Sequence, residues 1–258
     1  MFRTNEFVKA QSLEEAYQLN QKKSNVLLGG MVSMKMTHIT KRTIVDLSGL
    51  GLDAIEEKEG EFSIGCMCSL RSLELHEGLN RYFGGVFREC TKGIVGVQFR
   101  NGATVGGSVF GRYGFSDILT CMMMLDAQVE LYRRGRISLE EFAKLPYDRD
   151  ILVQVILKKD GRRAAYTSSR RSKTDFPMIA CGVAKKGDSW YVSVGARPAK
   201  AALCVLPDGK ETVQELAEKA AEAFTYGDNM RAGGEYRKYL AQVSIRRLME
   251  QISREEEK

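Results

Sequence analysis

Two glycine-rich turns hold the residues of this chain whose types and spacing could do chemistry. The first covers residues 27–34, directly after an apolar run, and the second covers residues 103–108. Glycine pairs after strands let the backbone pass within hydrogen-bond distance of a diphosphate, and successive amides form an anion-binding concavity. Ser33, Thr104 and Ser108 add hydroxyl groups without bulk. Together, the two turns predict a phosphate-binding cleft.

Neither turn is diagnostic alone, because a Gly-Gly pair is more often a tight turn than a phosphate cradle. Neither turn has the Gly-x-Gly-x-x-Gly spacing of a dinucleotide site, and the chain contains no Gly-x-x-x-x-Gly-Lys-Ser/Thr loop. The sequence therefore argues against a Rossmann site and against a P-loop.

The sequence contains few of the residues that other kinds of catalytic site require. Neither of the two histidines, His38 and His76, lies beside a recognisable nucleophile motif. The six cysteines contain no Cys-x-x-Cys pair. Cys66 and Cys68 are the most closely spaced, and two thiolates alone cannot complete a zinc or iron–sulfur site. We therefore predict neither a catalytic residue nor a metal ligand.

The composition is typical of a soluble globular protein, with 43% hydrophobic and 28% charged residues. No apolar stretch approaches the ~20 residues of a membrane span, and no secretory signal is visible. We therefore expect a cytoplasmic protein with no membrane partner. The net charge of +6 would also suit a nucleic-acid-binding protein. However, no aromatic-interleaved or helix-turn-helix pattern accompanies the basic clusters, which argues against nucleic acid as a partner.

The elements that position the turns can be predicted from periodicity and capping. Ser12 caps a first helix, and strands at 25–28 and 43–47 suggest a small layer with parallel pairing. Residues 101–114, which include the second turn, fit no helix pattern. The remaining elements of this half are a strand at 61–65, helices at 68–79, 80–92 and 117–127, a strand at 128–132 and a short helix capped by Ser138.

From residue 151 the pattern of the chain changes. A strand at 151–157 is followed by a hairpin of residues 179–184 and 190–195. Amphipathic helices at 212–223 and 236–252 close the chain. We place a domain boundary near residue 149.

In order along the chain, these segments resemble the FAD-binding subunit of molybdenum hydroxylases, a family that includes the medium subunit of carbon monoxide dehydrogenase and the flavin domain of xanthine dehydrogenase. The family's Ala-Gly-Gly-Thr-Asp-Leu signature corresponds to residues 28–33. Its Gln-Ile-Arg-Asn-x-Ala-Thr-Ile-Gly-Gly-Asn signature corresponds to residues 98–108. Ser116-Asp117 and the Leu-Asp-Ala of residues 125–127 follow at the family's spacing. The likeness continues into the last helix and covers essentially the whole chain.

The resemblance implies an α+β fold. Residues 1–149 would form a two-part FAD-binding domain of the PCMH/vanillyl-alcohol-oxidase-like type. Within it, residues 1–55 would be a small α/β subdomain and residues 56–149 a larger subdomain. Residues 150–258 would form a smaller α/β C-terminal domain with an antiparallel sheet and helices, like that of carbon monoxide dehydrogenase flavoproteins.

The resemblance also implies FAD as the cofactor and a set of residues that hold it. The two turns would enclose the diphosphate from two sides. Ser116 and Asp117 would hold hydroxyl groups of the ribityl chain or the adenosine, and apolar side chains would line the pocket and the isoalloxazine. The implied set is Leu27, Leu28, Gly29, Gly30, Met31, Val32, Ser33, Met34, Ile94, Val95, Phe99, Ala103, Thr104, Gly106, Gly107, Ser108, Phe110, Ser116, Asp117, Ile151 and Leu152.

Some of these positions depart from the family pattern. Ser108 stands where the family often has Asn, and residues 31–33 replace a more polar run. Residues 110–115 are bulkier than usual and lack the family's Pro, which makes Arg112 or Tyr113 a candidate contact for the flavin or its acceptor.

The implied function is electron transfer in a hetero-oligomer with a large molybdopterin-binding subunit and a small 2Fe–2S subunit. Electrons from the 2Fe–2S clusters would pass through FAD to NAD+ or another acceptor, and the polypeptide would position the flavin. Two alternatives stay open. One is a flavin-less assembly subunit of the same complex that has lost FAD through the changes at 31–33 and 108–115. The other is a free-standing flavin oxidoreductase.

Overall fold

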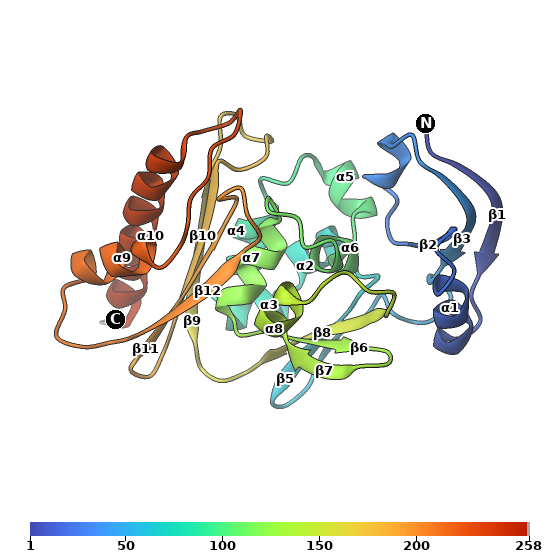
Figure 1. Cartoon of the computed structure of the whole chain (residues 1–258). Coiled ribbons are helices and arrows are strands. Elements are labelled where there is room, and N and C mark those ends of the chain that lie inside the picture. The colour runs from blue at the N-terminus through green and yellow to red at the C-terminus, as the bar shows by residue number, and fades with distance from the viewer. Residues whose placement is uncertain (257–258) are drawn as a thin grey trace.

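The structure is a computed structural model that describes residues 1–256. Three sheets follow one another along the chain, and helices fill the space between the second and third (Figure 1). The first sheet is parallel and the other two are antiparallel, in agreement with the predicted α+β class. Among residues 1–256, every helix is too short or too polar to span a bilayer.

The N-terminal layer is a three-stranded sheet with one helix packed on it. Its elements are β1 (Arg3–Lys9), α1 (Leu13–Asn20), β2 (Asn25–Leu28), the 3-10 helix η1 (Met34–Met36) and β3 (Thr40–Asp46). The strand order is β1-β3-β2, and both pairings are parallel, as the sequence predicts. Strand β1 was not predicted, because nearly all of its side chains are exposed and it lacks the apolar alternation of a half-buried strand.

The central layer is a five-stranded antiparallel sheet in the order β4-β5-β8-β6-β7. Its strands are β4 (Ile55–Glu57), β5 (Glu61–Gly65), β6 (Gln128–Leu131), β7 (Gly135–Ser138) and β8 (Leu152–Lys158). Short helices connect or flank these strands: α2 (Leu70–Leu75), α3 (Glu77–Tyr82), α4 (Val86–Thr91), α5 (Val97–Gly102), α6 (Val105–Phe110), α7 (Asp117–Met124) and α8 (Leu139–Lys144). Every residue of α7 is buried, so this helix forms the centre of the larger hydrophobic core.

Three predictions for this region need correction. The predicted helix at 68–79 is divided, because the extended backbone of His76 ends α2 and begins α3. The predicted helix at 80–92 is interrupted, because Gly84 and Gly85 both have positive φ and lie between the end of α3 and the start of α4. Residues 101–114, predicted to contain no helix, include the end of α5 and all of α6. Glycine has a low helix propensity, but α6 packs closely on the backbone of Cys66, where only glycine fits. A β-carbon on Gly106 would lie 2.7 Å from the Cys66 carbonyl oxygen.

The C-terminal layer is a four-stranded antiparallel sheet between helices. Its elements are β9 (Arg163–Ser169), β10 (Ile179–Lys186), β11 (Ser189–Gly195), β12 (Ala202–Pro207), α9 (Val213–Glu222) and α10 (Gly234–Glu256), and the strand order is β12-β11-β10-β9. The predicted hairpin is confirmed as β10 and β11. Helices α9 and α10 cover one face of the sheet, and α7 packs against the other face (Figure 1).

The position of strand β8 is relevant to the domain boundary predicted near residue 149. It pairs with β5 on one side and with β6 on the other, so it lies in the middle of the central sheet. A boundary at residue 149 would separate β8 from both of its partners. The first break in strand pairing after the central sheet lies between β8 and β9.

Candidate cofactor-binding site

The two glycine turns meet in space. A β-carbon built on Gly30 would lie 1.5 Å from the carbonyl oxygen of Gly102, and one on Gly29 would lie 3.0 Å from the hydroxyl oxygen of Thr104. A β-carbon on Gly102 would in turn lie 3.3 Å from the Cγ2 atom of Val32. Because the approach is this close, side chains at the glycine positions would separate the turns. The juxtaposition expected of a shared phosphate site is therefore present.

The first turn offers unused hydrogen-bond donors. It begins where β2 ends, and Met31 has a positive φ of 59°. Among residues 1–256, the amides of Gly30, Met31 and Val32 have no hydrogen-bond acceptor. Residues 27–32 are half-buried and Ser33 is exposed, so the free amides lie at the surface and not in the core. Consecutive free amides beside a positive-φ residue form a concavity that suits a phosphate oxygen.

The second turn is organised differently, because most of its amides are already used. Thr104 caps α6 and accepts a hydrogen bond from the Gly107 amide, at 3.1 Å. The Gly106 amide donates to the carbonyl oxygen of Cys66, at 2.7 Å. The hydroxyl hydrogen of Thr104 stays available as a donor, since the Thr104 oxygen acts only as an acceptor in these contacts. The second turn thus supplies a close backbone surface and a hydroxyl group, whereas the first supplies the amides.

Ser116 connects the second turn to α7. Its hydroxyl group donates to the carbonyl oxygen of Ser108 at 2.9 Å and accepts from the Leu119 amide at 3.1 Å. Ser116 therefore caps α7, as predicted, and also fixes the loop between α6 and α7 to the end of the second turn.

Asp117 is buried and already has partners within the chain. Its Oδ1 atom accepts a hydrogen bond from the Tyr166 hydroxyl and pairs with Nη2 of Arg170, both at 2.5 Å. Burial raises the pKa of the Asp117 carboxyl above its usual value, although Arg170 and Tyr166 oppose that rise. The carboxylate thereby connects α7 to β9 and to the segment that follows it.

The apolar side chains predicted to line the FAD pocket fall into two groups, one near the surface and one in the core. Val95 and Phe99 lie near the surface, Val95 being 47% exposed with a positive φ of 46°. Phe110 is half-buried. Ile151 and Leu152 are 0% and 4% exposed and belong to the main hydrophobic core. The surface group can contact a bound molecule directly, and contact through Ile151 and Leu152 stays a prediction.

A buried ion pair that the sequence analysis missed holds the residues around Val95 in place. Arg100 Nε lies 2.8 Å from Glu74 Oε2, and the same guanidinium donates to the carbonyl oxygens of Ile94 and Val95. Burial alone would raise the pKa of Glu74, but hydrogen bonds from Arg100 and Arg71 lower it below its usual value. The sequence contains one signal of this ion pair, which is Arg100 in the second signature. Its partner Glu74 lies too far away in sequence to be inferred.

The buried side chain of Arg112 makes its contacts near the end of α8. Arg112 is 2% exposed, has a positive φ of 46° and donates to the carbonyl oxygens of Phe142 and Leu145 near the end of α8. Its guanidinium carbon lies 4.2 Å from the centre of the Tyr147 ring. Arg112 thus stabilises the end of α8, and contact of Arg112 or Tyr113 with the flavin or its acceptor stays a prediction.

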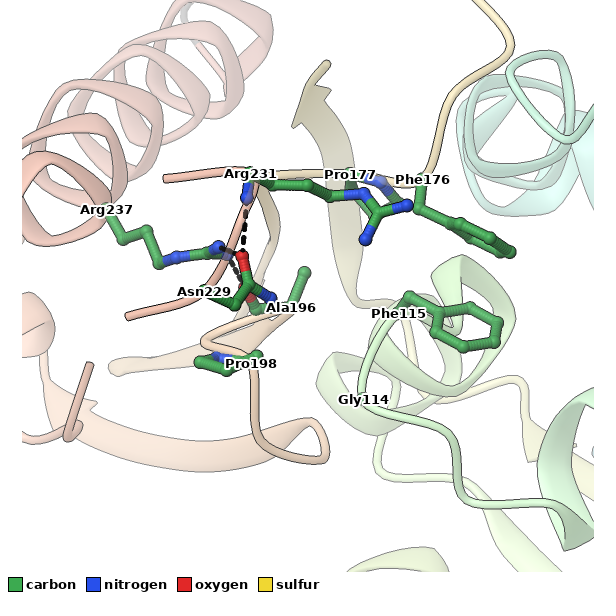
Figure 2. A pocket seen from close by; sticks show the side chains of 9 residues that line it. All are labelled: Gly114, Phe115, Phe176, Pro177, Ala196, Pro198, Asn229, Arg231 and Arg237. Atoms are coloured by element: carbon green, nitrogen blue, oxygen red, sulfur yellow. Dashed lines mark hydrogen bonds between the residues drawn. The ribbon is translucent and has the colours of Figure 1, made fainter. Parts of the chain in front are cut away.

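The loop after Arg112 instead presents aromatic rings. Tyr113 stacks on Phe115 with ring centres 5.3 Å apart, and Phe115 contacts Phe176 at 4.2 Å. All three rings are between 41% and 51% exposed. Figure 2 shows Phe115 and Phe176 beside a pocket that also borders the C-terminal layer.

The apposed turns and the mixed architecture define a class of protein. Residues 2–159 match the family described as the FAD binding domain in molybdopterin dehydrogenase, and the chain belongs to this family. FAD, the cofactor implied by the two signatures, is the cofactor of this family. Among residues 1–256 there is no group of three or more histidine, cysteine or acidic side chains that could hold a metal ion.

Individual relatives match along almost the whole chain. The uncharacterized protein YgfM of Escherichia coli (strain K12) is 24% identical over 247 residues, which is 93% of each chain. A solved structure of the Cu,Mo-CO dehydrogenase has a TM-score of 0.84 at 22% identity, covering 96% of both chains. Quinoline 2-oxidoreductase from Pseudomonas putida 86 has a TM-score of 0.81 at 17% identity, covering 97% of this chain and 95% of that one. These likenesses confirm the fold.

Proposed function

We propose that this chain is the FAD-binding electron-transfer subunit of a molybdenum hydroxylase complex. One observation carries the proposal: the amides of Gly30, Met31 and Val32 make no hydrogen bond among residues 1–256, in half-buried backbone where the first turn touches Gly102. Family membership supports FAD as the molecule that uses these donors. A diphosphate is the part of FAD that needs several convergent N–H groups, because its charge must be balanced without a metal ion.

The residues of the chain would divide the binding of FAD between them. The first turn would hold the diphosphate through its amides, with Thr104 and Ser33 adding hydroxyl donors. Val95 and Phe99 would cover apolar parts of the cofactor. FAD supplies the redox chemistry when bound, and the polypeptide orients it and shields it from water.

We infer partner subunits from family membership, since the matched family is the FAD-binding domain of molybdopterin dehydrogenases. A large molybdopterin-binding subunit would carry out substrate hydroxylation, and a small 2Fe–2S subunit would carry the electrons to the flavin. NAD+ or another acceptor would remove them. Solved relatives with this fold come from a Cu,Mo-CO dehydrogenase and from a quinoline 2-oxidoreductase, which supports a place in a molybdenum hydroxylase without selecting xanthine dehydrogenase chemistry. A cytoplasmic location is part of the same proposal.

Purification of the tagged chain from its native host tests these statements separately. We expect visible flavin absorption, FAD in the supernatant after denaturation, and molybdenum and iron in stoichiometric ratio to the chain. Anaerobic titration of the complex with NADH tests the acceptor, since reduction of the flavin would support NAD+. A colourless chain that does not take up added FAD would contradict the cofactor assignment. Flavin without molybdenum and iron would favour the free-standing oxidoreductase.

A second candidate function is a flavin-less assembly subunit, and two observations favour it. The Asp117 carboxylate is occupied by Tyr166 and Arg170, and the bulky rings of Phe115 and Phe176 contact each other. If these groups fill the space of the ring system, the complex would contain molybdenum and iron but no flavin. The same purification separates the two functions, because only the flavin content differs.

A further inference from the structure

A small cavity lies between the loop after α6 and the C-terminal layer (Figure 2). Gly114 and Phe115 border it on one side, and Ala196, Asn229 and Arg237 border it on the other. Its volume is about 80 Å³. This is space for several water molecules, or for one carboxylate or phosphate group. The cavity does not include either glycine turn, so it is separate from the proposed FAD diphosphate site.

Two guanidinium groups give the cavity its charge. Arg237 is 1% exposed, and its hydrogen bonds go to uncharged oxygens, namely the carbonyls of Met178 and Ala196 and the side chain of Asn229. Burial lowers the pKa of Arg237, and the positive charge of Arg231 lowers it further, whereas the negative charge of Asp228 raises it. Among residues 1–256 no carboxylate forms an ion pair with Arg237, so an anion in the cavity would reduce the cost of burying its charge.

Arg231 provides the unused donor. Its Nε atom is buried and has no hydrogen-bond partner among residues 1–256. The only carboxylate paired with it in this described region is Asp175, whose Oδ1 atom lies 3.6 Å from Nη2. Figure 2 shows the guanidinium of Arg231 between Asn229 and the ring of Phe176. Its carbon lies 5.1 Å from the centre of that ring. A buried N–H without an acceptor is expected to be satisfied by a bound group.

Two phenyl rings line one side of the cavity. Phe115 and Phe176 are 41% and 46% exposed, and their ring centres are 4.2 Å apart. Exposed phenyl rings beside a guanidinium suit a flat ring attached to an anion, because the ring can pack on the phenyl groups while the anion reaches the N–H donors.

We propose that this cavity binds a small planar molecule that carries a carboxylate or a phosphate group. The oxyanion pairs with the guanidinium group of Arg231, and the flat ring covers Phe115 and Phe176. The inference goes beyond the proposed flavin function, because neither glycine turn lines this cavity. Phe115 directly precedes Ser116, which bonds to Ser108, so an occupant would contact the loop that is fixed to the second glycine turn.

Binding can be measured with simple probes on the full chain. Benzoate and phenyl phosphate carry the two oxyanions on the same ring, and benzamide is the uncharged control. We expect either anion to bind by calorimetry and to shift the arginine Nε–H resonance that is absent from Arg231→Gln. Benzamide should bind much more weakly. Comparison of the two anions identifies which oxyanion the cavity takes.

Variants then localise the site. Arg231→Gln should weaken anion binding by about tenfold or more, since a hydrogen bond to a charged group is lost. Arg254→Gln removes the same charge from a side chain that is 76% exposed on α10, and it should leave binding unchanged. Asp175→Asn removes the competing carboxylate and should strengthen binding. Thermal unfolding of each variant checks that the fold is retained.

Three results would overturn the proposal. The first is that neither benzoate nor phenyl phosphate binds. The second is that benzamide binds as well as the anions do, which would show that charge is not recognised. The third is that Arg254→Gln weakens binding as much as Arg231→Gln, which would show attraction by overall charge alone. Each probe is added to the FAD-free chain, so that these results are distinguished from the test of the cofactor.

Discussion

The backbones of Gly30 and Gly102 touch: a β-carbon on Gly30 would lie 1.5 Å from the Gly102 carbonyl oxygen. A side chain at Gly30 would therefore require movement of one of the two backbones. Thr104, two residues after Gly102, caps α6 and cannot move without disturbing that helix. The free amides of the first turn are therefore held against a fixed surface.

Substitution of Gly30 by Ala tests this contact. The new methyl group would push the turns apart, and we expect loss of FAD uptake together with a destabilisation of about 2 kcal/mol, typical of overpacking. Gly60→Ala is the matched control, because a β-carbon there meets no atom within 4 Å. Flavin content after reconstitution and chemical unfolding measure the two effects. Unchanged FAD binding in Gly30→Ala would contradict the role given to the turns.

The ion pair of Asp117 with Arg170 should contribute to stability. Arg170→Gln leaves a buried carboxylate with only the Tyr166 hydroxyl as a side-chain partner, so we expect a loss of about 3 kcal/mol in the free energy of unfolding. Arg163→Gln, on an exposed side chain of β9, should change stability little. Arg170→Lys should restore part of the loss, since it restores the charge. Equal unfolding midpoints for Arg170→Gln and Arg163→Gln would disprove this role.

Asp160 should make the free energy of unfolding depend on pH in the acid range. Burial alone would raise its pKa, but hydrogen bonds and charges from Arg162 and Lys186 lower the pKa to about 2, from an ordinary value of 3.8. The unfolded chain therefore takes up the proton first as the pH falls. The contribution of Asp160, roughly 2 kcal/mol, is complete above about pH 4 and is lost as the pH falls towards 2.

Unfolding of Asp160→Asn across this pH range checks that prediction. The variant should be less stable at neutral pH and should lose less stability between pH 4 and 2 than the unmodified protein. Asp188→Asn, at an exposed position in the turn between β10 and β11, should behave like the unmodified protein. Parallel pH profiles for Asp160→Asn and the unmodified protein would refute the assignment.

The thiols should differ in reactivity. Burial raises the pKa values of Cys66 and Cys181 to about 12, and Cys90 and Cys121 are also buried. Cys204 is the least covered, although burial raises its pKa as well. Because the thiolate is the reactive form, native labelling with iodoacetamide should modify Cys204 first and the others only after unfolding. Mass spectrometry of the labelled peptides measures the order in which the cysteines are modified. Rapid modification of Cys66 in the native state would contradict the prediction.

Regular elements with local signals were predictable from the sequence. The capped helix α7, the hairpin of β10 and β11 and the parallel pairing of β2 with β3 follow from capping residues, turn residues and apolar runs. Exposed strands such as β1 and glycine-containing helices such as α6 were missed, because they depend on partners distant in sequence. The same limit applies to pairing in the central sheet, where alternation predicts a strand but not its neighbours.

For the candidate site, residue types were predictable and their roles only in part. The two turns were expected to act alike, yet the first supplies free amides and the second uses most of its own in α6. The partners of Asp117 and the inward position of Arg112 depend on Tyr166, Arg170 and Tyr147, which the local motif does not contain. Contacts of this kind are decided by packing between layers.

The position of β8 has a consequence for synthesis of the chain. Strands β5 and β6 each need β8 as a neighbour, yet β5 ends at Gly65 and β8 begins only at Leu152. Until β8 has been synthesised, one edge of each of these two strands has unpaired backbone N–H and C=O groups. Such unpaired edges can form hydrogen bonds with other chains. A fragment that stops at residue 149 would keep both edges open permanently, so shortened versions of this protein should aggregate.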